Sequence, residues 1–234
     1  MELLKEFCAE NMERVPAAIE AGAKRIELCD NLAVGGTSPS FGVIQGAVAY
    51  CSPRDIAVMT MVRPRGGNFV YSDAEKDMMR EDLRVARALG VTGVVFGCLT
   101  SDDAHGYRLD EDFTAELVGL AKAPLDKCGV PLHGASTAPV AVTFHMAFDE
   151  LEGAEQEHAI DVLANLGVER ILTHGGRAST PIVANLDRLR ELIAYADGRL
   201  AILPGAGITY ENVEDIASAL DVHECHGTKI VQLR

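Results

Sequence analysis

The chain has 234 residues, of which 48% are hydrophobic and 5% aromatic, and its formal net charge at pH 7 is −14. This length and composition predict one α/β domain with a single large core, covering residues 1–234. The negative charge argues against nucleic-acid binding, which needs patches of Lys and Arg. No basic leader, basic amphipathic stretch or membrane-length apolar run is present, so no membrane partner is expected. Six irregularly spaced cysteines indicate reduced thiols in a cytoplasmic protein.

Eight apolar runs recur along the chain and most end in polar or sulfur-containing residues. In chain order they are Leu3–Cys8, Arg25–Cys29, Ile56–Arg63, Gly93–Cys98, Val140–Phe148, Arg170–Thr173, Leu200–Leu203 and Val222–Cys225. Segments with helical periodicity lie between most of these runs. Buried strands that alternate with amphipathic helices predict a parallel sheet covered by helices. Eight such units predict a (β/α)8 TIM barrel.

The helix–strand junctions and the end of the chain refine this prediction. Gly22, Gly90 and Gly167 each stand where a helix ends and an apolar strand follows, a position that favours a positive φ. Only residues 227–234 lie beyond the last run and His226, so we expect the eighth helix to be short or missing. A neighbouring subunit would then cover that part of the barrel, which predicts a homodimer or a higher homo-oligomer.

The carboxyl ends of barrel strands are where active sites lie, and several reactive side chains share an inward parity there. Glu6 precedes Cys8 by two residues, and Glu27 precedes Cys29 by two. Arg63 shares the parity of the third strand's methionines. His145 alternates with large apolar residues that should face the helices, so it is expected to point inward.

Two interpretations of these charged residues remain open. In one, Glu6, Glu27 and Arg63 compensate one another as a structural ion-pair network inside the barrel. In the other, which we favour, they form a catalytic site: Arg63 binds an anionic group, and Glu27 or His145 transfers a proton.

Further residues point to an anionic ligand. Arg65 belongs to an Arg-Pro-Arg-Gly-Gly segment at a strand end, and guanidinium groups suit carboxylate or phosphate. Gly205 and Gly207 follow the seventh strand, His226 follows the eighth, and Gly175 follows the sixth. Loops at these places often bind phosphate through backbone N–H groups, although glycines also serve in tight turns.

Metal binding is the competing chemistry. The sulfur atoms of Cys8 and Cys29 are soft ligands that suit Cu(I), and no local zinc motif is present. Buried cysteines are also common as small apolar core residues, so both interpretations of Cys8 and Cys29 stay open.

The sequence resembles the CutC family over nearly its whole length. The resemblance rests on Glu6–Cys8, Arg25–Cys29, Gly35–Ser40, Arg63–Asp73, Val142–Asp149 and Leu203–Ile208. It implies a (β/α)8 barrel and a cytoplasmic protein of copper homeostasis, with copper bound at Cys8 and Cys29. The sequence departs from the family pattern at Met146, where many members carry Arg, and in the segment His223–Thr228. It also ends earlier than the longer members.

Two function hypotheses follow. The first is a copper homeostasis protein that binds Cu(I). The alternative is a barrel enzyme of unknown reaction that acts on a small anionic or phosphorylated substrate. A structural or regulatory oligomer is a third possibility. The expected partner is therefore a copper ion or a small anionic ligand, and whether the chain is an enzyme stays open.

Overall fold

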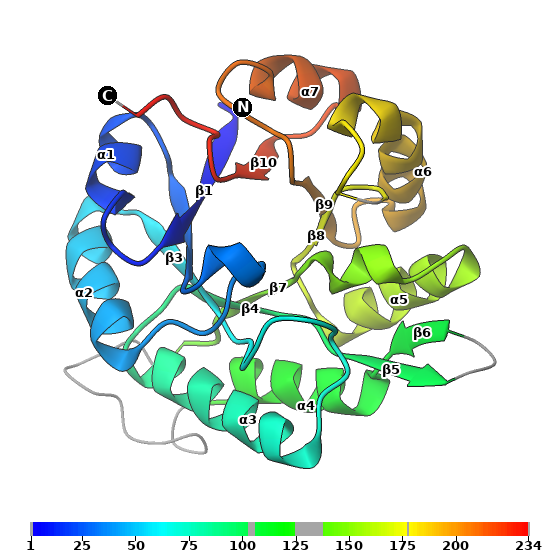
Figure 1. Ribbon diagram of the computed structural model, residues 1–234, viewed down its shortest axis with the longest axis horizontal. Coiled ribbons are helices and arrows are strands. Elements are labelled where there is room, and N and C mark those ends of the chain that lie inside the picture. Colours follow the sequence, from blue (N-terminus) through cyan, green and yellow to red (C-terminus); the bar gives the residue numbers. More distant parts are fainter. Residues whose placement is uncertain (1, 103–105, 125–137, 177, 234) are drawn as a thin grey trace.

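The computed structural model describes residues 2–102, 106–124, 138–176 and 178–233. Eight parallel strands form a ring in the order β10-β1-β2-β3-β4-β7-β8-β9 (Figure 1). They are β1 (Leu4–Glu10), β2 (Arg25–Cys29), β3 (Ala57–Met61), β4 (Gly93–Phe96), β7 (Ala141–Phe144), β8 (Arg170–Thr173), β9 (Ala201–Pro204) and β10 (Glu224–Gly227). All eight overlap the apolar runs of the sequence, so the predicted barrel is confirmed.

Helices surround the ring on its outer side (Figure 1). They are α1 (Val15–Glu20), α2 (Phe41–Cys51), α3 (Asp73–Ala88), α4 (Glu111–Lys122), α5 (Ala154–Leu166), α6 (Leu186–Ala196) and α7 (Val213–Leu220). Helix α3 begins with the capping box of Ser72 and Glu75. None of the described helices combines the length and the apolar character that a membrane crossing requires.

The barrel differs from an ideal one in two places. An antiparallel hairpin of β5 (Leu99–Asp102) and β6 (Gly106–Leu109), which the sequence analysis did not predict, follows β4. No helix follows β10 among the described residues up to 233, as expected for a short or missing eighth helix. Strands β9 and β10 share no hydrogen-bonded ladder, so the barrel is nearly closed. Gly205 nevertheless packs against His226 across this seam.

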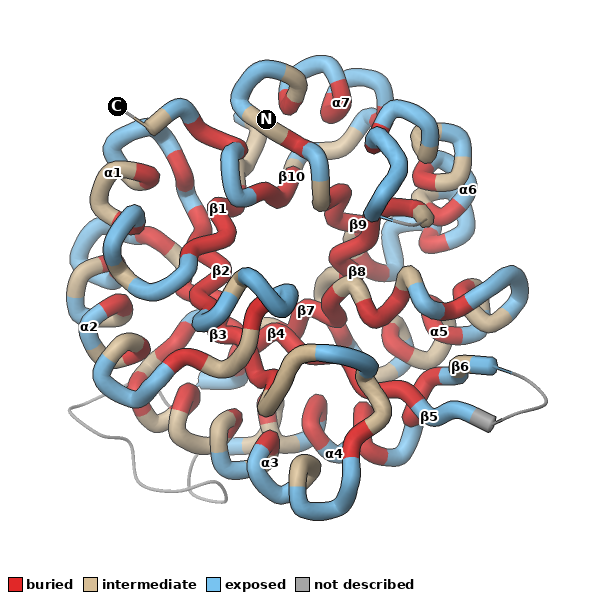
Figure 2. Tube along the Cα trace, viewed as in Figure 1, coloured by how far each residue is buried: buried red, intermediate tan, exposed pale blue. Residues whose placement is uncertain are grey.

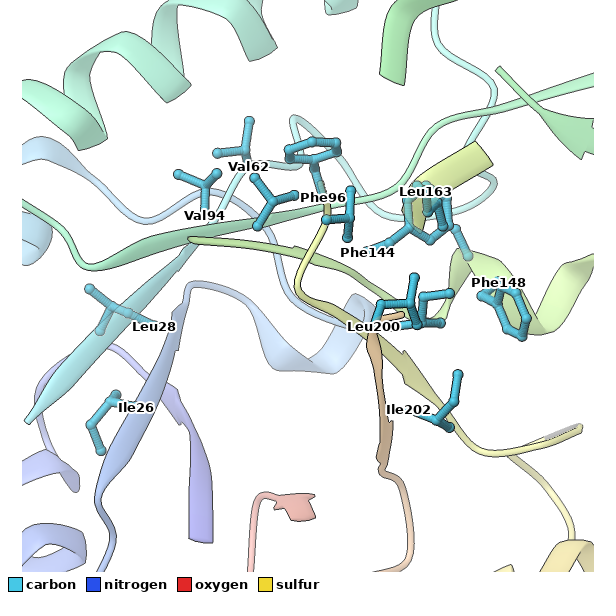
Figure 3. Close-up of a cluster of buried hydrophobic side chains, with 14 of the residues drawn as sticks. Ile26, Leu28, Val62, Val94, Phe96, Phe144, Phe148, Leu163, Leu200 and Ile202 are labelled. Carbon is cyan, nitrogen blue, oxygen red and sulfur yellow. The ribbon is translucent and has the colours of Figure 1, made fainter. Parts of the chain in front are cut away.

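Two apolar clusters result from the alternation of side chains along the strands. The larger cluster lies between the strands and the helices, and includes Ile26, Leu28, Phe96, Phe144 and Leu163 (Figure 3). The smaller cluster fills part of the barrel interior with Cys8, Cys29, Met59, Met61 and Val95. The strands are accordingly mostly buried, whereas buried and exposed residues alternate along each helix (Figure 2). The polar residues among the inward-facing side chains are buried with them.

Candidate active site

Charged side chains occupy the base of the barrel interior. In a barrel of this kind, inward-facing residues of alternate strands share a level. Arg25 on β2 and Arg170 on β8 meet at Glu224 on β10, with Arg25 Nη2 2.7 Å and Arg170 Nε 3.0 Å from Glu224 Oε2. A buried charge is costly unless it is paired, and these contacts provide the pairing.

Glu6 connects this base to the level above. Its carboxylate forms an ion pair with Arg25, and its Oε1 accepts a hydrogen bond from His226 Nδ1 at 2.8 Å. Burial alone would raise the pKa of Glu6. The hydrogen bond from His226 and the charge of Arg25 outweigh burial and lower this pKa to about 2. Glu6 is therefore ionised and fixes the orientation of the His226 ring.

Several hydrogen-bond donors lie around one of the two carboxylate oxygens of Glu27. Cys8 Sγ donates to Glu27 Oε2 at 3.2 Å, Cys29 Sγ lies 3.7 Å from the same oxygen, and His226 Nε2 lies 3.6 Å from it. The other oxygen, Oε1, is buried and has no partner among the described residues. Burial raises the pKa of the Glu27 carboxyl, although the charge of His226 opposes this. Glu27 thus combines a raised pKa with a free oxygen.

The groups around Glu27 hold their protons. Burial would lower the pKa of His226, but the charge of Glu27 and the hydrogen bonds to Cys8 and Glu6 raise it well above its usual value. The Cys8 thiol has a raised pKa because of its hydrogen bond with Cys29 and its burial. For Cys29, the hydrogen bond with Cys8 lowers the pKa, but burial and the charge of Glu27 raise it to about 11. An imidazolium and two neutral thiols therefore surround the carboxyl group.

His145, which follows β7, supplies a different kind of donor. Its Nδ1 accepts a hydrogen bond from the Ala147 N–H at 3.1 Å, so in the neutral ring Nε2 carries the proton. Burial first, and the charge of Arg63 second, lower the pKa of His145 to about 3. The Nε2 atom is buried and has no partner among the described residues. Gly97 permits this placement, since a Cβ there would lie 2.5 Å from His145 Nδ1.

Arg63, which lies just beyond the end of β3, joins two loops. Its guanidinium donates to the carbonyl oxygens of Val34 (3.2 Å), Gly36 (3.0 Å) and Gly67 (2.8 Å), and it lies 4.7 Å from the Phe69 ring centroid. It is 4% exposed, and no acidic side chain of the described residues pairs with it. Its Nε also has no partner there. Arg63 is thus a buried cation whose charge is not balanced locally.

These groups meet around one cavity of about 460 Å³ at the carboxyl ends of the strands. Its lining includes six residues that the sequence analysis selected: Cys8, Glu27, Arg63, His145, Gly207 and His226. Glu6 lies beneath the cavity, and Gly205 packs against His226 beside it. Cys29 is fully buried next to Glu27 and does not line the cavity. The volume lies in the range typical of small-molecule sites.

Two selected residues lie away from this cavity. Arg65 forms an ion pair with Glu75, with Nε 2.6 Å from Oε1, and donates to backbone oxygens of its own loop. The Gly175 N–H donates to Thr173 Oγ1 at 2.9 Å, and its Cα packs against Leu189. The structure therefore assigns these two residues local contacts in their loops.

The structure also changes one expected pairing. Arg63 was expected to compensate Glu6 and Glu27, but the cation that pairs with Glu6 is Arg25. Glu27 is in register with Met59, so Arg63 lies four positions further towards the strand end. Arg25 shares the parity of Glu27 and Cys29 on β2. That parity was visible in the sequence and could have identified it.

Known proteins resemble this chain over almost its whole length. Residues 3–231 match the model of the CutC family. A CutC family protein of Enterococcus faecalis is 52% identical over 98% of this chain and 100% of its own length. A human protein named copper homeostasis protein cutC homolog is 37% identical over 95% of this chain and 72% of its own length.

Solved structures agree with these sequence matches. The crystal structure of the CutC protein from Streptococcus agalactiae has a TM-score of 0.84 and 39% identity, covering 98% of this chain and 100% of that one. An aldolase with 13% identity has a TM-score of 0.66, covers 97% of this chain and 91% of its own, and supports the barrel fold alone. The family match and the sequence identities establish that the chain belongs to the CutC family.

Proposed function

We propose that this chain is a barrel enzyme that binds a small anionic carbonyl compound in the 460 Å³ cavity and transfers a proton within it. One observation carries the proposal. Two buried polar atoms of the cavity lining, Glu27 Oε1 and His145 Nε2, lack partners among the described residues. Buried polar groups are normally hydrogen-bonded, and exceptions often mark functional sites. The first atom is an acceptor from a carboxyl group with a raised pKa, and the second is a donor from a neutral ring.

The proposed step is proton abstraction next to a carbonyl group. Ionised Glu27 takes a proton from the carbon beside the carbonyl, so a C–H bond breaks and an O–H bond forms at Glu27. The electron pair of the C–H bond moves into a new C–C double bond, and the carbonyl oxygen becomes an enolate oxygen. The Nε2–H of His145 would donate to this oxygen as its charge develops, with Arg63 adding positive potential. Reprotonation by Glu27 completes the exchange.

Binding of oxalate tests the proposal, because this planar dianion resembles an enolate of a 2-oxo acid. Calorimetric titration of wild-type protein is expected to show binding. His145→Asn should weaken it about tenfold or more, since the shorter side chain can still accept from the Ala147 N–H but has no donor at the Nε2 position. His145→Gln places an N–H near that position and should recover part of the affinity.

The control is His158→Asn on α5, where an exposed histidine pairs with Glu111. This variant should bind oxalate as the wild type does. Wild-type protein that does not bind oxalate, or equal affinity in His145→Asn, would contradict the proposed site.

We propose Cu(I) binding as a second candidate function. Ligand atoms of Cys8, Glu27 and His226 lie within 4.8 Å of one another, and Cys29 adds a second thiol beside Glu27. Thiolates and imidazole suit Cu(I), whereas a carboxylate does not. The ion would have to displace protons from thiols with raised pKa values and from His226. Relatives from human and mouse are named for copper homeostasis, which supports a role of this chain there.

An anaerobic competition between the protein and a Cu(I) chelator tests this candidate. If Cu(I) is held at these thiols, Cys8→Ala should weaken binding about tenfold or more. Cys51→Ala is the matched control, because Cys51 is equally buried but lies at the end of α2. Equal Cu(I) affinity in Cys8→Ala, Cys51→Ala and wild-type protein would count against copper as a ligand of this site.

The cellular setting is part of the proposal. Cys8, Cys29, Cys51, Cys98 and Cys225 are free thiols, which is the usual state in the reducing cytoplasm. We therefore propose a cytoplasmic protein.

We also propose that the protein forms homo-oligomers, because no helix covers the barrel after β10 among the described residues. Sedimentation of the purified chain tests this proposal.

A further inference from the structure

The outer part of the cavity wall, here called the rim, consists of residues 206–209, which follow β9, and residues 227–229, which begin at the last residue of β10. The two segments are joined to each other. Thr209 and Lys229 form a parallel β-bridge, and the Tyr210 N–H donates to the Lys229 carbonyl oxygen at 2.8 Å. Gly207, Thr228 and Lys229 are exposed, whereas Glu27, His145 and His226 are buried. The cavity therefore runs from a polar, accessible rim to a buried reactive end.

Several backbone N–H groups of the rim are available as hydrogen-bond donors. The amides of Ala206, Gly207, Ile208 and Thr228 make no hydrogen bond to another described residue. Ala206 has a φ of 58° and Gly207 a φ of 75°. A left-handed conformation costs an alanine about 1 kcal/mol or more, and such strain concentrates where a ligand is bound. Successive amides in turns of this kind form concave binding sites for anions.

The charge of the rim is also suited to an anion. Lys229 lines the cavity and has no ion pair with any described residue. The acidic residue of the cavity lining, Glu27, is buried at the far end and already accepts from Cys8. The rim thus combines a cation with unpaired amides, although the net charge of the chain is −14.

We propose that the rim binds a phosphate monoester group, so that the substrate is a phosphorylated carbonyl compound. Its phosphate would accept from the amides of the rim and from Lys229, and its carbonyl end would reach His145 and Glu27. This inference rests on the proposed function for the carbonyl end of the ligand. The phosphate site itself depends only on the rim.

Titration with inorganic phosphate tests the rim, and titration with oxalate tests the buried end. Lys229→Glu is expected to weaken phosphate binding about tenfold or more, because it replaces the local cation with a negative charge that repels phosphate at close range. Lys24→Glu is the matched control. Lys24 is equally exposed but precedes β2, at the opposite end of the barrel, and should change neither affinity.

The outcomes separate the two proposals. Equal phosphate affinity in Lys229→Glu and Lys24→Glu, or no phosphate binding by wild-type protein, overturns the rim site. Phosphate binding that depends on Lys229 supports it even if oxalate does not bind. In that case the rim site stands and the proposed proton transfer at Glu27 and His145 fails.

Discussion

Replacing Arg25 with leucine is expected to lower the free energy of unfolding at pH 7 by about 3–5 kcal/mol. Arg25 pairs with both Glu6 and Glu224 inside the barrel. Its removal leaves Glu6, which is 1% exposed, as a buried carboxylate with His226 as its remaining cationic partner. Urea denaturation of the two proteins measures the difference. Arg84→Leu on α3 removes an exposed pair with Glu81 and should change the value by less than about 0.5 kcal/mol.

The same network predicts a pH dependence of stability. Folding lowers the pKa of Glu6 from 4.5 to about 2. The resulting stabilisation is fully present above pH 4.5 and is lost as the pH falls towards 2, because the unfolded chain binds the proton first. It amounts to about 3 kcal/mol. The slope of the unfolding free energy against pH in this window should be shallower in Arg25→Leu. Parallel slopes in both proteins would show that Arg25 does not hold the Glu6 charge.

Replacing Glu27 with glutamine is expected to reduce proton transfer by about a hundredfold or more. The assay is the uptake of solvent deuterium at the carbon beside the carbonyl, followed by NMR over a panel of small 2-oxo acids and phosphorylated hydroxycarbonyl compounds. Because burial raises the pKa of Glu27, this carboxyl group stays protonated, and inactive as a base, up to a higher pH than a free carboxyl group does. The wild-type rate should therefore rise with pH through this raised pKa, which lies above 4.5.

Stability separates a catalytic role of Glu27 from a structural one. A buried carboxyl with a raised pKa destabilises the folded state at neutral pH, so Glu27→Gln should leave the free energy of unfolding unchanged or higher. Glu20→Gln at the exposed end of α1 should alter neither property. A loss of stability in Glu27→Gln with exchange retained would assign this residue to the structural network instead.

Much of the fold could be predicted because its signals are local. Most strands lie in runs rich in apolar residues, since a strand covered on both faces is largely apolar. Gly90 and Gly167 adopt φ of 85° and 80° at helix ends, as their sequence positions indicated. The hairpin of β5 and β6 was missed, because Leu99–Leu109 has little apolar alternation and its pairing is with itself rather than with the barrel.

The candidate site was predictable to the extent that it depends on parity. Glu27 and His145 were chosen because alternate residues of a strand face the same side, whereas His226 was chosen as a residue after the last strand. His226 lies within β10 instead, and all three residues line the cavity. Arg25 obeys the same rule but stands at the start of its strand, away from the carboxyl ends where barrel active sites are expected. Arg65 stands two residues after Arg63, beyond the end of β3, where strand parity no longer governs direction.

The positions of the strands along the chain and the alternation of inward and outward side chains thus follow from the amino-acid pattern, because both are local properties of the backbone. Which charges meet was decided by the closed barrel alone. His226 reaches Glu6 and Glu27 only because β10 pairs with β1, and Arg25 rather than Arg63 neutralises Glu6 because of the register between β1 and β2. Register between strands far apart in the chain is set by the packing of the whole core, which no local pattern encodes.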